Sequence, residues 1–238
     1  MIETPTPVAP AKGLLARAIG VITSPKATYE AVVANPKPFG ILLLAGLVMG
    51  LAQGLPQMTQ RGRQAAVAMQ VQMMERFGQQ IPAEAIPAME ERAKFSSYFS
   101  VPTTTIGVAA ACLFFSAIFW AIFNVIFGGT ASFKQVFAVV AHSQVIGALG
   151  YALSAPIMYA QGTMSMGGPF NLGILVPMLD EQSLIASVLG ATSVFAIWGS
   201  LNTGTGLGVL FKRNGLTIGI VLIVIWLGIA AGVASILS

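Results

Sequence analysis

The chain has 238 residues, of which 55% are hydrophobic and 8% are charged, and its formal net charge is +4. Soluble domains carry about 25% charged residues, so this composition excludes a soluble globular protein. Basic residues such as Lys37, Lys134 and Lys212 stand at the ends of apolar stretches, and they form no dense patch with interleaved aromatic residues. This placement is typical of membrane anchors, and we expect no nucleic-acid partner.

The amino-terminal segment is predicted to hold a tail and interfacial helices. Three prolines fall within the first ten residues, which contain little that could be buried, so residues 1–11 are expected to form a disordered tail. Across 12–35, apolar residues recur at helical spacing, with Lys12 and Arg17 on the flank. This pattern predicts short amphipathic helices in the membrane interface, with their basic side near lipid phosphate. Ser24-Pro25 marks the start of the second helix.

Five apolar stretches are each near or above the roughly 20 residues that a helix needs to cross the hydrocarbon core. They cover residues of about 39–55, 106–127, 133–158, 184–211 and 216–237. A polar insert at 58–99 separates the first two, and its methionine-rich face repeats at helical spacing. The sequence therefore predicts an all-α integral membrane protein, with one domain over 12–238 that holds five transmembrane helices, the interfacial amphipathic helix and a helical insert.

The basic residues also predict an orientation, because cytoplasmic loops carry the excess of Lys and Arg. A cytoplasmic amino terminus places Lys134 and the Lys212-Arg213 turn on the same side and puts Asp180 and Glu181 outside. The insert is the exception, since its five basic residues then lie outside.

Glycines recur at spacings of three and four within the predicted crossings, which gives smooth faces where another helix can approach closely. These helix-packing candidates are Gly46, Gly50, Gly54, Gly147, Gly150, Gly228 and Gly232. Packing within the chain and packing against a second copy are both open at this point.

A polar cluster interrupts the third crossing, where His142, Ser143 and Gln144 stand together. Polar side chains at membrane depth are costly unless they face other helices or water, so this segment is predicted to lie inside the bundle. Asn124 and Asn202 are the asparagines of neighbouring crossings that could join the cluster. The five residues either link helices by hydrogen bonds or line a transport or sensing site.

No motif predicts catalysis, a metal or a cofactor. Cys112 is the single cysteine and His142 the single histidine, so no metal-ligand set can be assembled from them. The glycines at 204–208 lack dinucleotide-binding spacing and follow no predicted strand. Asp180 and Glu181 are adjacent and cannot face each other across a substrate. We therefore expect a protein that is not an enzyme and holds no cofactor.

Three stretches carry a family resemblance: the Ser24-Pro25 segment, SFKQVFAVVAHS from Ser132, and GLGVLFKRNGLTIG from Gly206. The chain resembles the Yip1 domain family in its compact prokaryotic form, from about Leu14 to Ala234. The resemblance implies a five-helix, non-enzymatic protein of a bacterial cytoplasmic membrane. Eukaryotic relatives, which bind Rab GTPases, carry a Gly-Tyr and proline pattern in the third crossing and an aspartate-leucine-tyrosine-glycine-proline element. This chain lacks both, so Rab binding is not implied.

Two functions are compatible with these features. The first is a scaffold or adaptor that acts by helix packing, with the lipid bilayer and other membrane proteins or a second copy as partners. The alternative is a small transporter, channel or channel subunit that uses the polar site around His142.

Overall fold

The structure, a computed structural model, describes residues 13–165, 167–180 and 183–237, and in these residues it contains helices and no strand. The predicted tail at 1–11 lies outside this part of the chain. Five of the described helical stretches are long and apolar enough to cross a membrane. They are α3 (Pro38–Gln57), α6 (Ser100–Trp120) with the π-helical turn η2 (Ala121–Ile126), α7 (Phe133–Gln161), α9 (Val194–Phe211) and α10 (Gly215–Leu237). The predicted all-α membrane fold with five crossings is confirmed.

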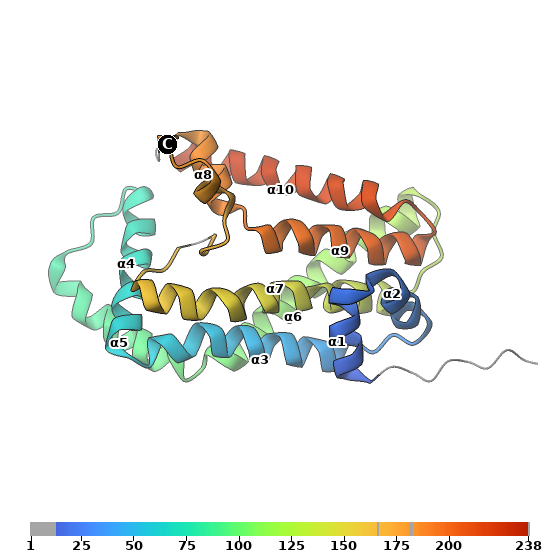
Figure 1. Cartoon of the computed structure of the whole chain (residues 1–238), viewed down its shortest axis with the longest axis horizontal. Helices are drawn as coiled ribbons and strands as arrows, with labels where there is room; N and C mark the ends of the chain where they lie inside the picture. The colour runs from blue at the N-terminus through green and yellow to red at the C-terminus, as the bar shows by residue number, and fades with distance from the viewer. Residues whose placement is uncertain (1–12, 166, 181–182, 238) are drawn as a thin grey trace, which may run out of the picture.

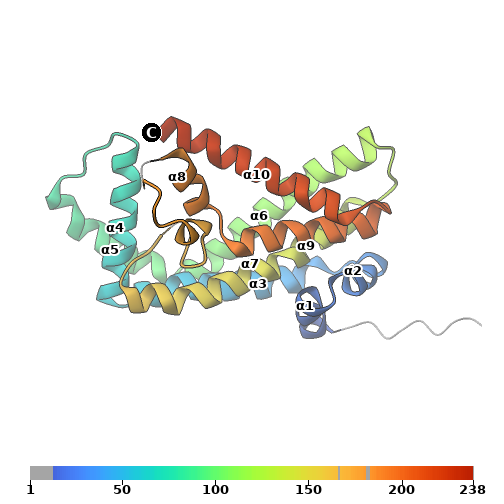
Figure 2. The ribbon, with the colours of Figure 1, turned by 45° about the horizontal axis from the view of Figure 1, so that its top comes forward.

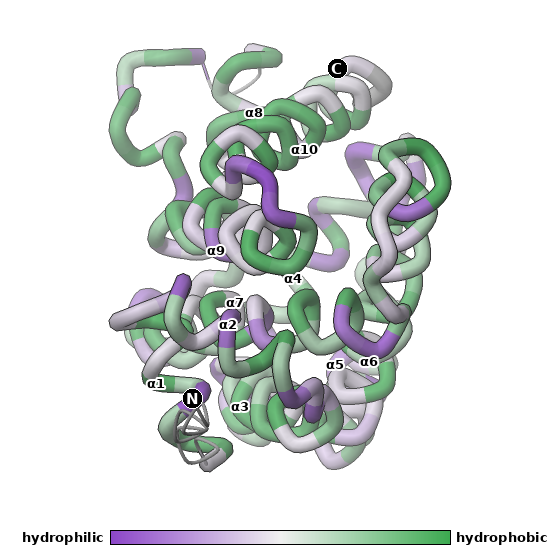
Figure 3. Tube along the Cα trace, turned by 90° about the vertical axis from the view of Figure 1, so that its right-hand side faces the viewer, coloured by the Kyte–Doolittle hydropathy of each residue, from purple (hydrophilic) through white to green (hydrophobic). Residues whose placement is uncertain are grey.

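The long helices lie side by side, and each runs opposite to the one before it in the chain, so the neighbours α3 and α7 run in the same direction (Figure 1). α7 is the most buried of them; it packs between α3 and α9 and also contacts α6. α10 packs on the outer side of α9 and is the most exposed. Hydrophobic residues follow one another along α10 in Figure 3, as expected for a helix that faces lipid over most of its circumference.

Two short helices, α1 (Leu14–Thr23) and α2 (Pro25–Ala34), pack across the end of the bundle where α7 begins and α9 ends (Figures 1 and 2). Pro25 takes the first position of α2, where its missing N–H is not needed. Arg17 of α1 is buried and its Nη1 donates to the carbonyl oxygen of Asn35, 3.1 Å away. The prediction that Arg17 faces lipid phosphate is therefore wrong, because the guanidinium satisfies a carbonyl at the carboxyl end of α2.

The insert forms α4 (Gln60–Arg76), a short turn η1 (Ala83–Ala85) and α5 (Ile86–Ser97) at the opposite end of the bundle (Figure 1). Arg61 anchors it: Nη2 donates to the carbonyl oxygen of Ala160 at 2.6 Å, and the guanidinium lies 5.9 Å from the ring centroid of Tyr159. Both residues belong to the last turn of α7, whose carbonyls have no helical donor. The insert is thus fixed to the core of the bundle.

The fourth crossing was predicted as one helix over 184–211, and the structure corrects this. α8 (Leu184–Ala191) ends before Thr192 and Ser193, and α9 starts at Val194. The break arises because Thr192 accepts a hydrogen bond from the Leu172 amide and the Val194 amide donates to Phe170. This pairing with the loop before η3 (Leu172–Leu175) holds the backbone extended, so α9 alone has spanning length.

Two further boundaries shift outward from the prediction. The second crossing starts at Ser100 rather than about 106, because the hydroxyls of Thr103 and Thr105 bond to carbonyls one turn back and leave the helix intact. The third continues through Pro156 to Gln161, where Gly162 takes a left-handed conformation with φ of 70°. Glycine, not proline, ends this helix.

Glycines let α3 approach its neighbours closely. A Cβ added at Gly50 would stand 2.5 Å from the Cα atom of Val101 in α6, and added Cβ atoms at Gly46 and Gly54 would also meet α6. In α7, Gly147 lies against Met49 of α3 and Gly150 against the ring of Phe195 of α9. These close approaches leave room for no side chain larger than hydrogen.

Candidate functional site

His142 lies at the centre of α7 and is completely buried. Its Nδ1 is 2.7 Å from the carbonyl oxygen of Ala138. Since a carbonyl only accepts, Nδ1 carries the proton and Nε2 presents a bare lone pair. Nε2 has no hydrogen-bond partner in the described part of the chain. His142 is therefore a buried acceptor that the protein leaves unsatisfied.

The two residues after His142 bind locally. Ser143 is buried, and its hydroxyl donates to the carbonyl oxygen of Val140, 2.8 Å away. Gln144 is half-buried and its side chain reaches the thiol of Cys112 in α6. Neither provides a partner for Nε2 of His142.

Asn124 lies away from this cluster, at the hairpin between α6 and α7. Its Nδ2 donates to the carbonyl oxygen of Ala131 at 2.6 Å, and its Oδ1 accepts from the Ala131 amide at 3.1 Å. The side chain thereby closes the turn, which begins at Gly128 with φ of 69°. His142 follows the start of α7 by nine residues, a rise of about 14 Å. Asn124 is part of the turn and does not join the polar cluster.

Asn202 of α9 holds the amino-terminal helices to the bundle. Its Oδ1 accepts from the hydroxyl of Tyr29 at 2.5 Å, and its Nδ2 donates to the carbonyl oxygen of Val21 at 2.9 Å. That carbonyl needs an outside donor because its helical partner would be residue 25, which is a proline. Burial raises the pKa of Tyr29, so the phenol keeps its proton and donates.

Asn202 and His142 share one level of the bundle. Gly206 of α9 lies against Val139 of α7 and Tyr29 of α2. α7 and α9 run in opposite directions (Figure 1). The residue one turn before Gly206, which is Asn202, therefore lies at the height of the residues one turn after Val139, which include His142. Asn202 thus lies level with His142, although no hydrogen bond joins them. Of the predicted site residues, His142, Ser143 and Asn202 are buried.

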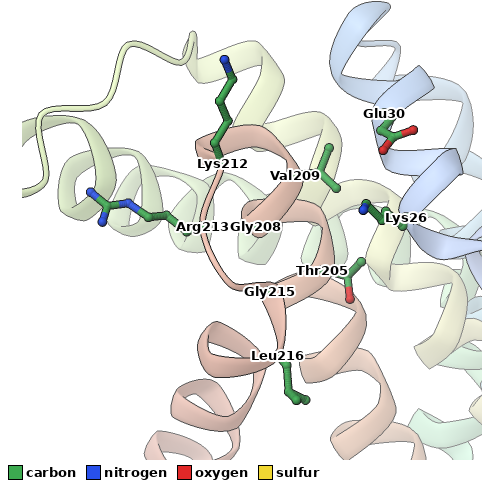
Figure 4. A pocket seen from close by; sticks show the side chains of 9 residues that line it. All are labelled: Lys26, Glu30, Thr205, Gly208, Val209, Lys212, Arg213, Gly215 and Leu216. Carbon is green, nitrogen blue, oxygen red and sulfur yellow. The ribbon is translucent and has the colours of Figure 1, made fainter.

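One cavity lies at the end of the bundle that α1 and α2 cover. It has a volume of about 510 Å³ and is lined by α2, the last turn of α9 and the start of α10 (Figure 4). Another, of about 10 Å³, lies beside Arg61 at the other end. His142 lines neither of them.

A family model, the Yip1 domain, matches residues 19–237. The chain belongs to the Yip1 domain family. No curated protein and no solved structure matches the chain with significance. Yip1 proteins are membrane proteins that are in general non-enzymatic and interact with other proteins, so this Yip1 chain is an integral membrane protein in contact with lipid.

Three of the predicted site residues of this Yip1 chain form hydrogen bonds within the fold. Asn202, Asn124 and Ser143 all bond to backbone or to Tyr29, which is what interhelical and turn contacts require. In the residues that the structure describes, no group of three His, Cys, Asp or Glu side chains could hold a metal ion. The sequence did not predict the hydrogen bonds that Tyr29 and Arg17 form with other helices and turns. The one signal in the sequence was Pro25, which has no N–H to donate to a carbonyl of α1.

Proposed function

We propose that this Yip1 chain is a non-enzymatic scaffold or adaptor in membrane organisation or trafficking, which acts through helix packing and partner binding. The observation that carries the proposal is the free face of α10. A Cβ added at Gly228 or Gly232 would have no atom within 4 Å. Ile225, Ile229 and Val233 beside them are exposed.

These five residues are spaced by three and four along α10, so they lie on one face of the helix. Small residues at GxxxG spacing allow two helix backbones to approach, and van der Waals contacts then favour association in lipid. The amino-terminal half of α10 already uses this principle, since Gly215 and Gly219 contact Gly204 of α9. We infer that the face at 225–233 receives a second transmembrane helix, from another copy or from another membrane protein.

Replacing both Gly228 and Gly232 with leucine is expected to abolish this association, because the new side chains separate the backbones. Light scattering of the chain in phosphatidylcholine nanodiscs measures it. Gly107→Leu is the matched control, since Gly107 is an exposed glycine of α6 with no atom within 4 Å of an added Cβ. A wild-type chain that is strictly monomeric, with nothing reproducibly co-purifying, would count heavily against the proposal.

The insert and the amino-terminal helices supply two further contact surfaces in this proposal. Phe77, Phe95 and Tyr98 of the insert are exposed aromatic residues at one end of the bundle. Leu15 and Ile19 of α1 are exposed at the other end, which supports an interfacial position for that helix. Large exposed apolar side chains at both membrane boundaries are suited to contact the boundary between headgroups and acyl chains, or to contact a protein partner.

The charges support an orientation with the amino terminus in the cytoplasm of a bacterium. Among the described residues, the end with α1 and α2 carries Arg17, Lys26, Lys37, Lys134, Lys212 and Arg213, with Glu30 as the one acidic residue. The insert end carries five basic residues and as many acidic ones, counting Asp180. An excess of Lys and Arg marks the cytoplasmic side, and we propose the bacterial inner membrane because the chain resembles the compact prokaryotic form of the family.

One observation favours the alternative of a small transporter or channel, namely the unpaired Nε2 of His142. A scaffold does not require this atom for its function. In that case His142→Leu is expected to leave the free energy of unfolding unchanged within about 1 kcal/mol or to raise it, because the substitution removes a buried acceptor without a partner. Thermal unfolding in detergent measures this. A proton or solute flux into proteoliposomes that falls in the variant would instead favour the transporter.

A further inference from the structure

The cavity at the end of the bundle carries an excess of positive charge. Lys26 and Glu30 come from α2, and Lys212 and Arg213 come from the turn between α9 and α10. Figure 4 shows Lys26 and Glu30 facing this turn, with Lys212 and Arg213 extending from it in different directions. All four side chains are exposed, so they can reorient towards a ligand.

None of the three basic side chains is neutralised by a described residue. Lys26, Lys212 and Arg213 form no ion pair with any acidic residue of the described chain, and the guanidinium of Arg213 lies 5.9 Å from the ring centroid of Phe127. The lining contains three cations and a single carboxylate, that of Glu30. The cavity is therefore suited to an anion.

The backbone holds Lys212 in a conformation that favours glycine. Lys212 has φ of 53° and is the one non-glycine residue with positive φ in the described part of the chain. It ends α9 in the left-handed region, where glycine is the usual residue. A lysine at a position that favours glycine points to a use for its side chain.

An apolar track leads from the cavity into the membrane. Leu216 lines the cavity, and Ile220 and Val224 follow it at intervals of four, so the three share one face of α10. All three are exposed. Because α9 ends at Phe211 and α10 starts at Gly215, the cavity lies at the edge of the hydrocarbon layer, where headgroups stand.

We propose that this cavity binds the phosphate headgroup of an acidic glycerophospholipid. Lys26, Lys212 and Arg213 contact the phosphate, and one acyl chain lies along Leu216, Ile220 and Val224. The volume of about 510 Å³ is within the range of small-ligand sites. The phosphate chemistry alone fits a soluble phosphate ester as well, and the track on α10 is what assigns the ligand to a lipid.

The test uses the purified full chain in phosphatidylcholine nanodiscs or micelles titrated with phosphatidylglycerol. Native mass spectrometry counts the lipid retained, and thermal unfolding measures the stabilisation it confers. Each charge removed is expected to weaken binding about fivefold, so Lys26→Gln with Lys212→Gln weakens it about 25-fold. Glu30→Gln is expected to strengthen binding, because it removes the opposing charge.

Lys134→Gln is the matched control, since Lys134 is an exposed lysine at the same end of the bundle that does not line the cavity. It is expected to bind phosphatidylglycerol like the wild type.

An equal loss in Lys134→Gln would overturn the proposal in favour of diffuse surface charge. Equal stabilisation by water-soluble glycerol phosphate would overturn the lipid assignment, and equal stabilisation by phosphatidylcholine would overturn the anion site. Lys26→Arg keeps the charge and should retain binding.

Discussion

Replacing Gly204 with alanine is expected to lower the free energy of unfolding by about 1–3 kcal/mol, the usual cost of overpacking. An added Cβ would stand 2.5 Å from the carbonyl oxygen of Gly215 and 2.6 Å from the Cα atom of Gly219. Both are backbone atoms of α10, so no side chain can turn aside. The two helices must move apart along their closest contact, and thermal unfolding in detergent micelles measures the loss.

Gly199→Ala is the matched control for this change. Gly199 lies on the same helix, five residues earlier, and has no atom within 4 Å of an added Cβ. Alanine has the higher helix propensity, so this variant should be as stable as the wild type or slightly more stable. If the two variants unfold at the same temperature, α9 and α10 do not pack as described.

Replacing Asn202 with leucine is expected to cost roughly 2–6 kcal/mol, because it leaves two buried groups unpaired at about 1–3 kcal/mol each. These groups are the hydroxyl of Tyr29 and the carbonyl of Val21. The amino-terminal helices should detach from the bundle, and trypsin should then cleave after Arg17 or Lys26 at a higher rate. Thermal unfolding and the cleavage rate measure the two effects.

Ser200→Ala serves as the control for Asn202→Leu, since the Ser200 hydroxyl bonds only to the carbonyl oxygen of Ala196 in its own helix. It is expected to change stability little. Tyr29→Phe combined with Asn202→Leu should cost less than the sum of the two single changes, as contacting residues do. Strict additivity of the two changes would show that the hydrogen bond between Tyr29 and Asn202 does not hold the helices.

The five crossings could be predicted from the sequence because bilayer thickness fixes the length of a spanning helix. Apolar run length therefore located α3, α7 and α10 within a few residues. The break before α9 could not be predicted, since Thr192 and Ser193 are extended through pairing with a loop about 20 residues earlier. Local hydropathy carries no information on such a pairing.

The glycine spacing predicted close-packed faces but not their partners. Gly46, Gly50 and Gly54 were expected on one face, and the structure places that face against α6. Gly228 and Gly232 have the same spacing and no neighbour within the chain. The period of a pattern gives the face of a helix, while the partner depends on how the helices are arranged.

The polar contacts were the least predictable part of the candidate site. Asn202 bonds to Tyr29 and Val21, which are more than 170 residues away in sequence. Lys26 and Lys212 were understood as separate membrane anchors, and only the fold brings them to one cavity. Residue type and depth indicated that these groups need partners, but the partners come from the packing of α1 and α2 on α9.

The most direct test of the scaffold proposal is cysteine cross-linking along α10 in native membranes. Single cysteines at positions 222–233 are introduced into a Cys112→Ala background, which removes the one native cysteine. Each cysteine carries a thiol-attached photo-cross-linker, which reacts with any neighbouring helix whether or not that helix contains a cysteine. The proposal predicts intermolecular cross-links that peak at positions 225, 228, 229 and 232, with the period of a helix. Cross-linking that is absent at every position, or equal around the helix, would contradict the proposal that this face binds another helix.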